Sequence, residues 1–216
     1  MRGSTSAAVV AFLALMLPDL TRAETQAGGR EALEKLLSGE PEQNPPGPDR
    51  EMTLFSAIIA RPPSDNDIIV RWLRRHLDHL HPEFTFELAR RVFPDDRDAA
   101  LEWFVMGEAR FAYDLARCAD PPEGSDVALA TIERHFRPLP DYLRGHAKEH
   151  ADALRRAAAR RDLFAPETSP ACSDDPEDAD AVRPRDQWPP IEERLRARMV
   201  KEAEELEAKH AAPPSR

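Results

Sequence analysis

The chain has 216 residues, of which 41% are apolar and 32% charged, and its formal net charge is −10. This negative charge argues against wrapping DNA or RNA through bulk charge, and 8 glycines are too few for a collagen. Two cysteines exclude a disulfide-rich miniature scaffold, whereas the apolar content suffices for a core; the 21 prolines predict that part of the chain lies outside it.

The first 23 residues have the pattern of a secretory signal peptide. Arg2 is followed by an apolar run at 7–17, and Thr21 and Ala23 place small residues before a cleavage site. The run is shorter than the roughly 20 residues that a membrane-spanning helix needs. We therefore expect 1–23 to be a signal peptide, the mature chain to have no transmembrane segment, and the location to be periplasmic or secreted.

The next segments alternate between linker and helix. Residues 24–48 are predicted as a proline-rich linker with a short helix, and 49–165 as a helical domain. The first predicted helix of this domain begins near Asp49. The helices predicted after it span 68–81, 83–93, 97–118, 126–137 and 141–164. No window has the two-residue alternation that favours strands. The prediction is an all-α fold, a single domain of five or six helices arranged as a bundle or a short α-solenoid.

The C-terminal part differs in composition. Residues 166–190 hold six prolines and seven acidic residues, which predicts an irregular acidic strap. Residues 191–210 are predicted as a charged helix with a narrow apolar stripe, followed by a tail at 211–216. Such a helix either packs on its own domain or meets a partner helix.

Cys118 and Cys172 are the two cysteines of the chain, with 53 residues between them. In an exported protein one disulfide is the default, and it would tie the strap to the helical domain. The alternative is a pair of reactive thiols, for which the chain offers no C-x-x-C motif.

The predicted helix 97–118 carries polar residues in unexpected places. A helical wheel places Glu108 within an apolar arc, where a buried carboxylate requires a partner, a raised pKa or a metal. The opposite face aligns an aromatic ring, a bare backbone position and charged side chains, which predicts an interaction stripe that meets another helix or chain. Its members are Trp103, Gly107, Arg110, Asp114 and Arg117.

Histidines and carboxylates suggest a metal site. His146-x-x-Glu149-His150 matches the H-x-x-E-H pattern, in which two histidines four residues apart can bind one zinc ion. His76 lies on an apolar helix face, as Glu108 does, and bundle cores are where such ligands converge. The sequence therefore permits a mononuclear zinc or copper site formed by His76, Glu108, His146 and His150. The first expectation is that the protein has no cofactor, and zinc is the alternative.

No nucleophile elbow, phosphate-binding loop, dinucleotide fingerprint or haem-attachment motif occurs in the chain. The first hypothesis is an exported, non-enzymatic helical binding or accessory protein of the bacterial envelope, whose partner is another envelope protein and not a nucleic acid. It depends on the interaction stripe and on a detachable helix 191–210. The alternative is a small metal-binding protein or metallohydrolase that uses the helix with His146, Glu149 and His150.

Overall fold

The computed structural model describes residues 29–38, 48–120, 125–164, 170, 172 and 181–211. The predicted signal peptide at 1–23 lies outside the described residues, as do most of the linker and of the strap. The chain divides into two compact units, residues 1–40 and 41–216. In the first unit the described residues form a helix over 29–37. None of the described helices is long and apolar enough to cross a membrane.

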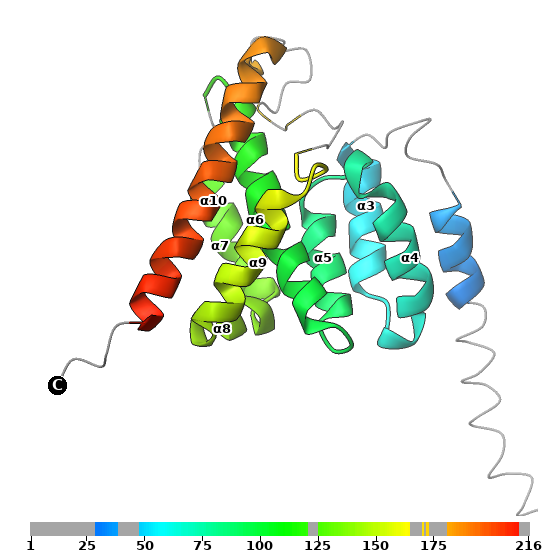
Figure 1. The fold of residues 1–216 in the computed structure, drawn as a ribbon. Helices are drawn as coiled ribbons and strands as arrows, with labels where there is room; N and C mark the ends of the chain where they lie inside the picture. Colours follow the sequence, from blue (N-terminus) through cyan, green and yellow to red (C-terminus); the bar gives the residue numbers. More distant parts are fainter. Residues whose placement is uncertain are drawn as a thin grey trace, which may run out of the picture. The chain divides into compact units, whose positions relative to one another are not determined.

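The second unit is all-helical in its described part, which confirms the predicted fold class (Figure 1). The α-helices are, in chain order, α3 Pro48–Ile59, α4 Asn66–His76, α5 Glu83–Val92, α6 Arg97–Arg117, α7 Ser125–His135, α8 Pro138–Gly145, α9 Ala147–Ala159 and α10 Trp188–Ala211. Helix α6 packs on α5 and also on α9 and α10, while α3 and α4 pack on α5. Contacts between helices distant in sequence make this a bundle, since in a solenoid each repeat contacts only its neighbours.

Aromatic rings join α5, α6 and the segment after α7. The ring of Phe86 lies 5.2 Å from that of Phe104 and 5.8 Å from that of Phe136. A Cβ atom on Gly107 would lie 2.9 Å from the Phe86 ring, so only glycine allows α6 to approach α5 this closely. The start of α6 agrees with the sequence prediction, because the Asp96 carboxylate accepts the backbone N–H of Ala99 at 3.0 Å.

The predicted helix 141–164 is wrong in its extent. Two helices, α8 and α9, replace it, and the backbone breaks at His146, whose φ of −132° and ψ of 65° are not helical. Gly145 precedes the break, and glycine is a poor helix residue that is common at helix ends. Helix α9 ends at Ala159, where Arg196 of α10 donates hydrogen bonds to the carbonyl oxygens of Ala158 and Arg160.

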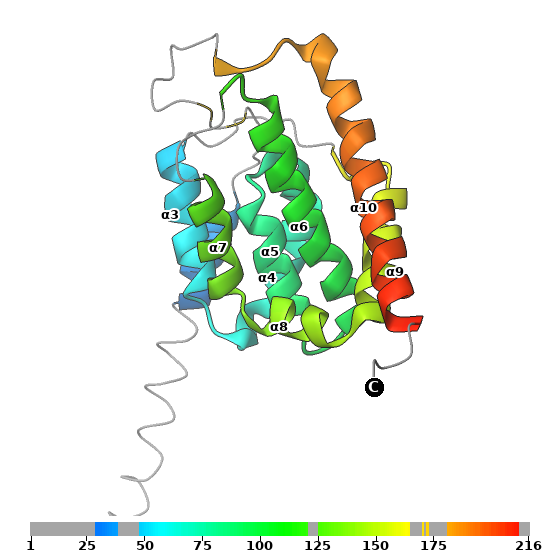
Figure 2. The same ribbon diagram turned by 90° about the vertical axis from the view of Figure 1, so that its left-hand side faces the viewer.

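Helix α10 packs on its own domain, alongside α9 in both views (Figures 1 and 2). Its apolar stripe is buried at Ile191, Met199 and Ala203. Near its other end Arg155 of α9 pairs with Glu207. Of the two alternatives for this helix, the structure has the packing on its own domain, where this chain covers the apolar stripe that a partner helix would need.

The strap is fixed to the end of α6 at two points. The predicted disulfide between Cys118 and Cys172 is present, with 5.3 Å between the Cα atoms. Just beyond it, Ala119 donates its N–H to Ala181 at 2.8 Å, and Arg183 donates to the Arg117 carbonyl at 2.7 Å. This second attachment is an antiparallel bridge, and it sets where the chain enters α10.

Candidate functional site

The predicted interaction stripe lies mostly inside the molecule. Gly107 is buried, and Arg110, Asp114 and Arg117 are each 5% exposed or less, while Trp103 is half-buried beneath the guanidinium of Arg160. Of the two alternatives for this stripe, another helix or another chain, the described contacts are with elements of the same chain. The helical wheel assumed one apolar face, whereas α6 is covered on more than one side.

Arg110, a member of this stripe, forms hydrogen bonds with the backbone of other segments of the chain. Its guanidinium donates to the carbonyl oxygens of Leu77 at 3.1 Å, Asp162 at 2.8 Å and Leu163 at 3.0 Å. It also pairs with the Asp78 carboxylate at 2.7 Å. The side chain therefore satisfies carbonyl groups at the ends of two other segments, a role that arginine fills through its five donors.

Arg117 joins the end of α6 to the start of α10. Its guanidinium lies 4.5 Å from the centre of the Tyr113 ring and 4.7 Å from that of Trp188, and it donates to Asp114 at 2.5 Å. The indole N–H of Trp188 in turn donates to the Arg183 carbonyl at 2.9 Å. These contacts hold the first turn of α10 in place.

Acidic side chains from three helices surround His81. The His81 backbone N–H donates to Glu51 at 2.5 Å, its Nδ1 contacts the Glu83 carboxylate, and its Nε2 lies 4.0 Å from Asp114. Burial raises the pKa of Glu51 and of Asp114. Burial alone would lower the pKa of His81, but the carboxylates of Glu83, Asp114 and Glu51 outweigh it, so this pKa is raised.

We predict that this cluster makes the protein less stable as the pH rises. The folded state holds the His81 proton more tightly than the unfolded chain does, so the contribution of His81 is complete below its ordinary pKa of 6.5 and is lost as the pH rises through the raised value. The raised pKa values of Glu51 and Asp114 act in the same direction. Urea unfolding on both sides of pH 6.5 should therefore give a flatter stability profile for His81→Gln than for the natural chain above that pH.

Asp162 provides the contrast in this experiment. The Arg160 hydrogen bond lowers the pKa of Asp162, so its contribution is lost as the pH falls and is the same in both proteins. The difference between the two profiles gives the contribution of His81 together with its effect on Glu51 and Asp114, whose pKa values the His81 charge lowers. Parallel profiles across this range would contradict the prediction.

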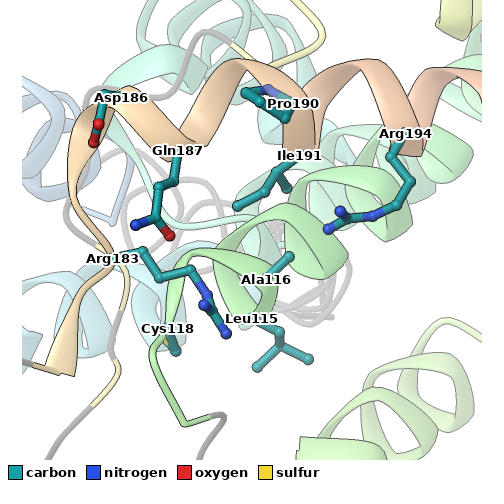
Figure 3. Close-up of a pocket in the computed structure, with 9 residues that line it drawn as sticks. All are labelled: Leu115, Ala116, Cys118, Arg183, Asp186, Gln187, Pro190, Ile191 and Arg194. Carbon is teal, nitrogen blue, oxygen red and sulfur yellow. The ribbon is translucent and has the colours of Figure 1, made fainter.

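A pocket of about 520 Å³ opens between the end of α6 and the first turns of α10 (Figure 3). Its lining combines Cys118 of the disulfide, apolar side chains and polar groups. The residues are Leu115, Ala116, Cys118, Arg183, Asp186, Gln187, Pro190, Ile191 and Arg194. Both attachments of the strap therefore lie at this pocket, and they hold the Arg183 side of it against α6.

The charges in the pocket are unequal. The guanidinium groups of Arg183 and Arg194 both extend toward the space between the two helices, and Asp186 lies at the opposite end of the lining from Arg194 (Figure 3). The Arg183 guanidinium donates one hydrogen bond, to the Ala119 carbonyl at 3.1 Å. Arg194 is exposed and makes no hydrogen bond or ion pair with any described residue. One positive charge in excess over an apolar floor favours an anionic group on an organic ligand.

No protein-family model, curated protein or solved structure matches this chain.

The structure does not bring the predicted metal ligands together. His76 is buried in α4 with its ring 4.9 Å from that of Trp72, and Glu108 lies in the wall of a second pocket. Among the described residues, no group of three or more His, Cys, Asp or Glu side chains is arranged to hold a metal ion.

The H-x-x-E-H residues also differ from the predicted arrangement. His146 precedes α9, stacks on the Tyr142 ring at 3.8 Å, and its Nδ1 contacts the Tyr142 carbonyl at 2.8 Å. Glu149 accepts the Tyr142 hydroxyl at 2.7 Å. His150 is half-buried, and burial lowers its pKa. His146 and Glu149 thus contact Tyr142 of α8, and the helix breaks at His146, so the two histidines do not lie on one continuous helix.

The pocket residues of the strap were not predicted from the sequence. Arg183 and Gln187 lie in a stretch that was expected to be irregular and held only by Cys172. One signal was present: Trp188 is a large aromatic residue at the end of a polar, proline-rich segment, where burial against the folded domain is the ordinary expectation.

Proposed function

We propose that this protein is an exported, non-enzymatic binding protein of the bacterial envelope, and that its pocket takes a small organic ligand with a carboxylate group. One observation carries the proposal. Arg183 and Arg194 face an apolar floor in a pocket of about 520 Å³, which lies within the range of roughly 300–1,000 Å³ typical of small-molecule sites.

The lining of the pocket favours binding of a small molecule inside it over attachment of a ligand to the protein surface. Buried Ile191 and Cys118 supply apolar contact, and a guanidinium binds a carboxylate through two parallel hydrogen bonds. The disulfide and the backbone bridge hold the strap side of the pocket before a ligand arrives, which reduces the entropy lost on binding. The Cys118–Cys172 disulfide is also compatible with an oxidising compartment such as the periplasm.

Calorimetric titration with phenylbutyrate tests this proposal, with phenylbutanol as the uncharged ligand of the same shape. We expect the acid to bind more tightly than the alcohol. Arg194→Gln should weaken binding of the acid by about tenfold or more, because a hydrogen bond to a charged group contributes roughly 1.5–3 kcal/mol. Arg183→Gln should act in the same direction.

Arg134→Gln is the matched control, because Arg134 is an exposed arginine of α7 outside the pocket lining. This variant should bind the acid as the natural chain does. Equal binding of the acid and the alcohol, or an equal loss in the Arg194 and Arg134 variants, would reject the proposal.

A further inference from the structure

A second pocket, of about 270 Å³, lies between α6, α7, α9 and α10. It does not share any lining residue with the pocket at the strap. The lining residues that are buried are all apolar: Val105, Ala109, Leu154 and Met199. Leu129, Leu195 and Ala112 are half-buried and complete the apolar wall. The volume leaves room for one ring or a short alkyl chain, just below the roughly 300 Å³ at which drug-sized sites begin.

The charged residues of this lining are less buried than its apolar wall. Glu108 of α6 is half-buried, and Arg198 and Glu202 of α10 are exposed. Two carboxylates against one guanidinium leave one negative charge in excess. Glu108 already interacts within the protein, whereas Glu202 accepts no hydrogen bond from any described residue.

The nearby histidine does not cancel this charge. His150 interacts electrostatically with Glu202, but burial lowers the pKa of His150, so its imidazole is neutral at neutral pH. An apolar interior with a negatively charged rim matches a ligand that has an apolar body and a positive end. An ammonium group at Glu202 would gain a charge-assisted hydrogen bond while the body displaces water from the wall.

We propose that this pocket binds a small organic cation, a primary ammonium attached to a single ring or a short alkyl chain. The apolar part lies against Val105, Ala109 and Leu154, and the ammonium group lies at Glu202 with Glu108 behind it. The site differs from the strap pocket in its elements and in the sign of its charge. It therefore stands whether or not the strap pocket binds carboxylates.

Calorimetry with benzylammonium, using benzyl alcohol as the uncharged ligand of the same shape, tests the proposal on the full-length protein. We expect benzylammonium to bind more tightly, and Glu202→Gln to weaken its binding by about tenfold, which corresponds to about 1.4 kcal/mol. Glu202 is exposed, so this variant should fold. Glu205→Gln is the control, since Glu205 is an exposed glutamate of the same helix that lies outside the lining.

A second variant tests the apolar part of the site. Ala112→Leu adds atoms to the pocket wall and should abolish binding of benzylammonium, while an unchanged circular dichroism spectrum shows that the variant is folded. Arg194→Gln should bind benzylammonium normally, which separates this site from the strap pocket. The proposal is overturned if benzylammonium and benzyl alcohol bind equally, or if the Glu202 and Glu205 variants behave alike.

Discussion

Replacement of Arg110 by alanine should lower the free energy of unfolding by about 3–5 kcal/mol, because three carbonyl oxygens lose their donor and each buried acceptor left without a partner costs roughly 1–3 kcal/mol. The guanidinium is 1% exposed and serves three carbonyl oxygens and the Asp78 carboxylate. Alanine would leave these acceptors without a donor and open a cavity between α6 and the segment after α9. Urea unfolding followed by circular dichroism measures the loss.

Two further variants make this result specific. Arg110→Lys should recover little of the loss, because one ammonium group cannot reach carbonyl groups on two separate segments. Arg134→Ala, which removes an exposed arginine, should change the free energy of unfolding by no more than about 0.5 kcal/mol. If Arg110→Ala lowers the free energy of unfolding by less than about 1 kcal/mol, water forms hydrogen bonds with the carbonyl groups in place of Arg110. The structural role assigned to Arg110 would then be wrong.

Loss of the disulfide is the second large effect. The double variant Cys118→Ser, Cys172→Ser should be less stable by about 4 kcal/mol, because the unfolded chain is then free of a closed loop of 53 residues. We expect the variant to fold, since the bridge between Ala119 and Ala181 also attaches the strap.

A reducing agent provides the matched measurement. It should lower the urea midpoint of the natural chain to that of the double serine variant and leave the variant itself unchanged. A natural chain that keeps its midpoint after full reduction would show that the disulfide contributes little to the stability of the folded state.

The fold class was predictable because helical periodicity and caps are local signals. Asp96 illustrates this: an acidic residue before an apolar repeat marks a helix start, and its carboxylate does cap α6. The break at His146 was missed because a period of 3.6 residues continues across it, while the backbone departs from helix at a single position. Periodicity over a window does not register one such residue.

The burial of α6 could not be predicted from its own sequence. Arg110 and Arg117 look solvent-exposed on a wheel, yet their guanidinium groups are buried because carbonyl oxygens and aromatic rings from distant segments satisfy them. Those partners lie 33 or more positions away, at Leu77, Leu163 and Trp188. Only the tertiary arrangement places them together. The strap pocket was missed for the same reason, since Arg183 and Arg194 meet α6 only after the strap is attached.

The disulfide also closes part of the chain into a covalent ring and leaves the C-terminal part outside it. The bond between Cys118 and Cys172 encloses α7, α8 and α9, whereas α10 lies outside the ring. One backbone cut within the ring would leave both fragments joined through the sulfur atoms. A cut between Cys172 and Ala181 would leave α10 held only by non-covalent contacts, among them Arg196 at the end of α9 and Arg117 beneath Trp188. Both pockets use α10 as a wall, so their integrity depends on a helix that lies outside the disulfide ring.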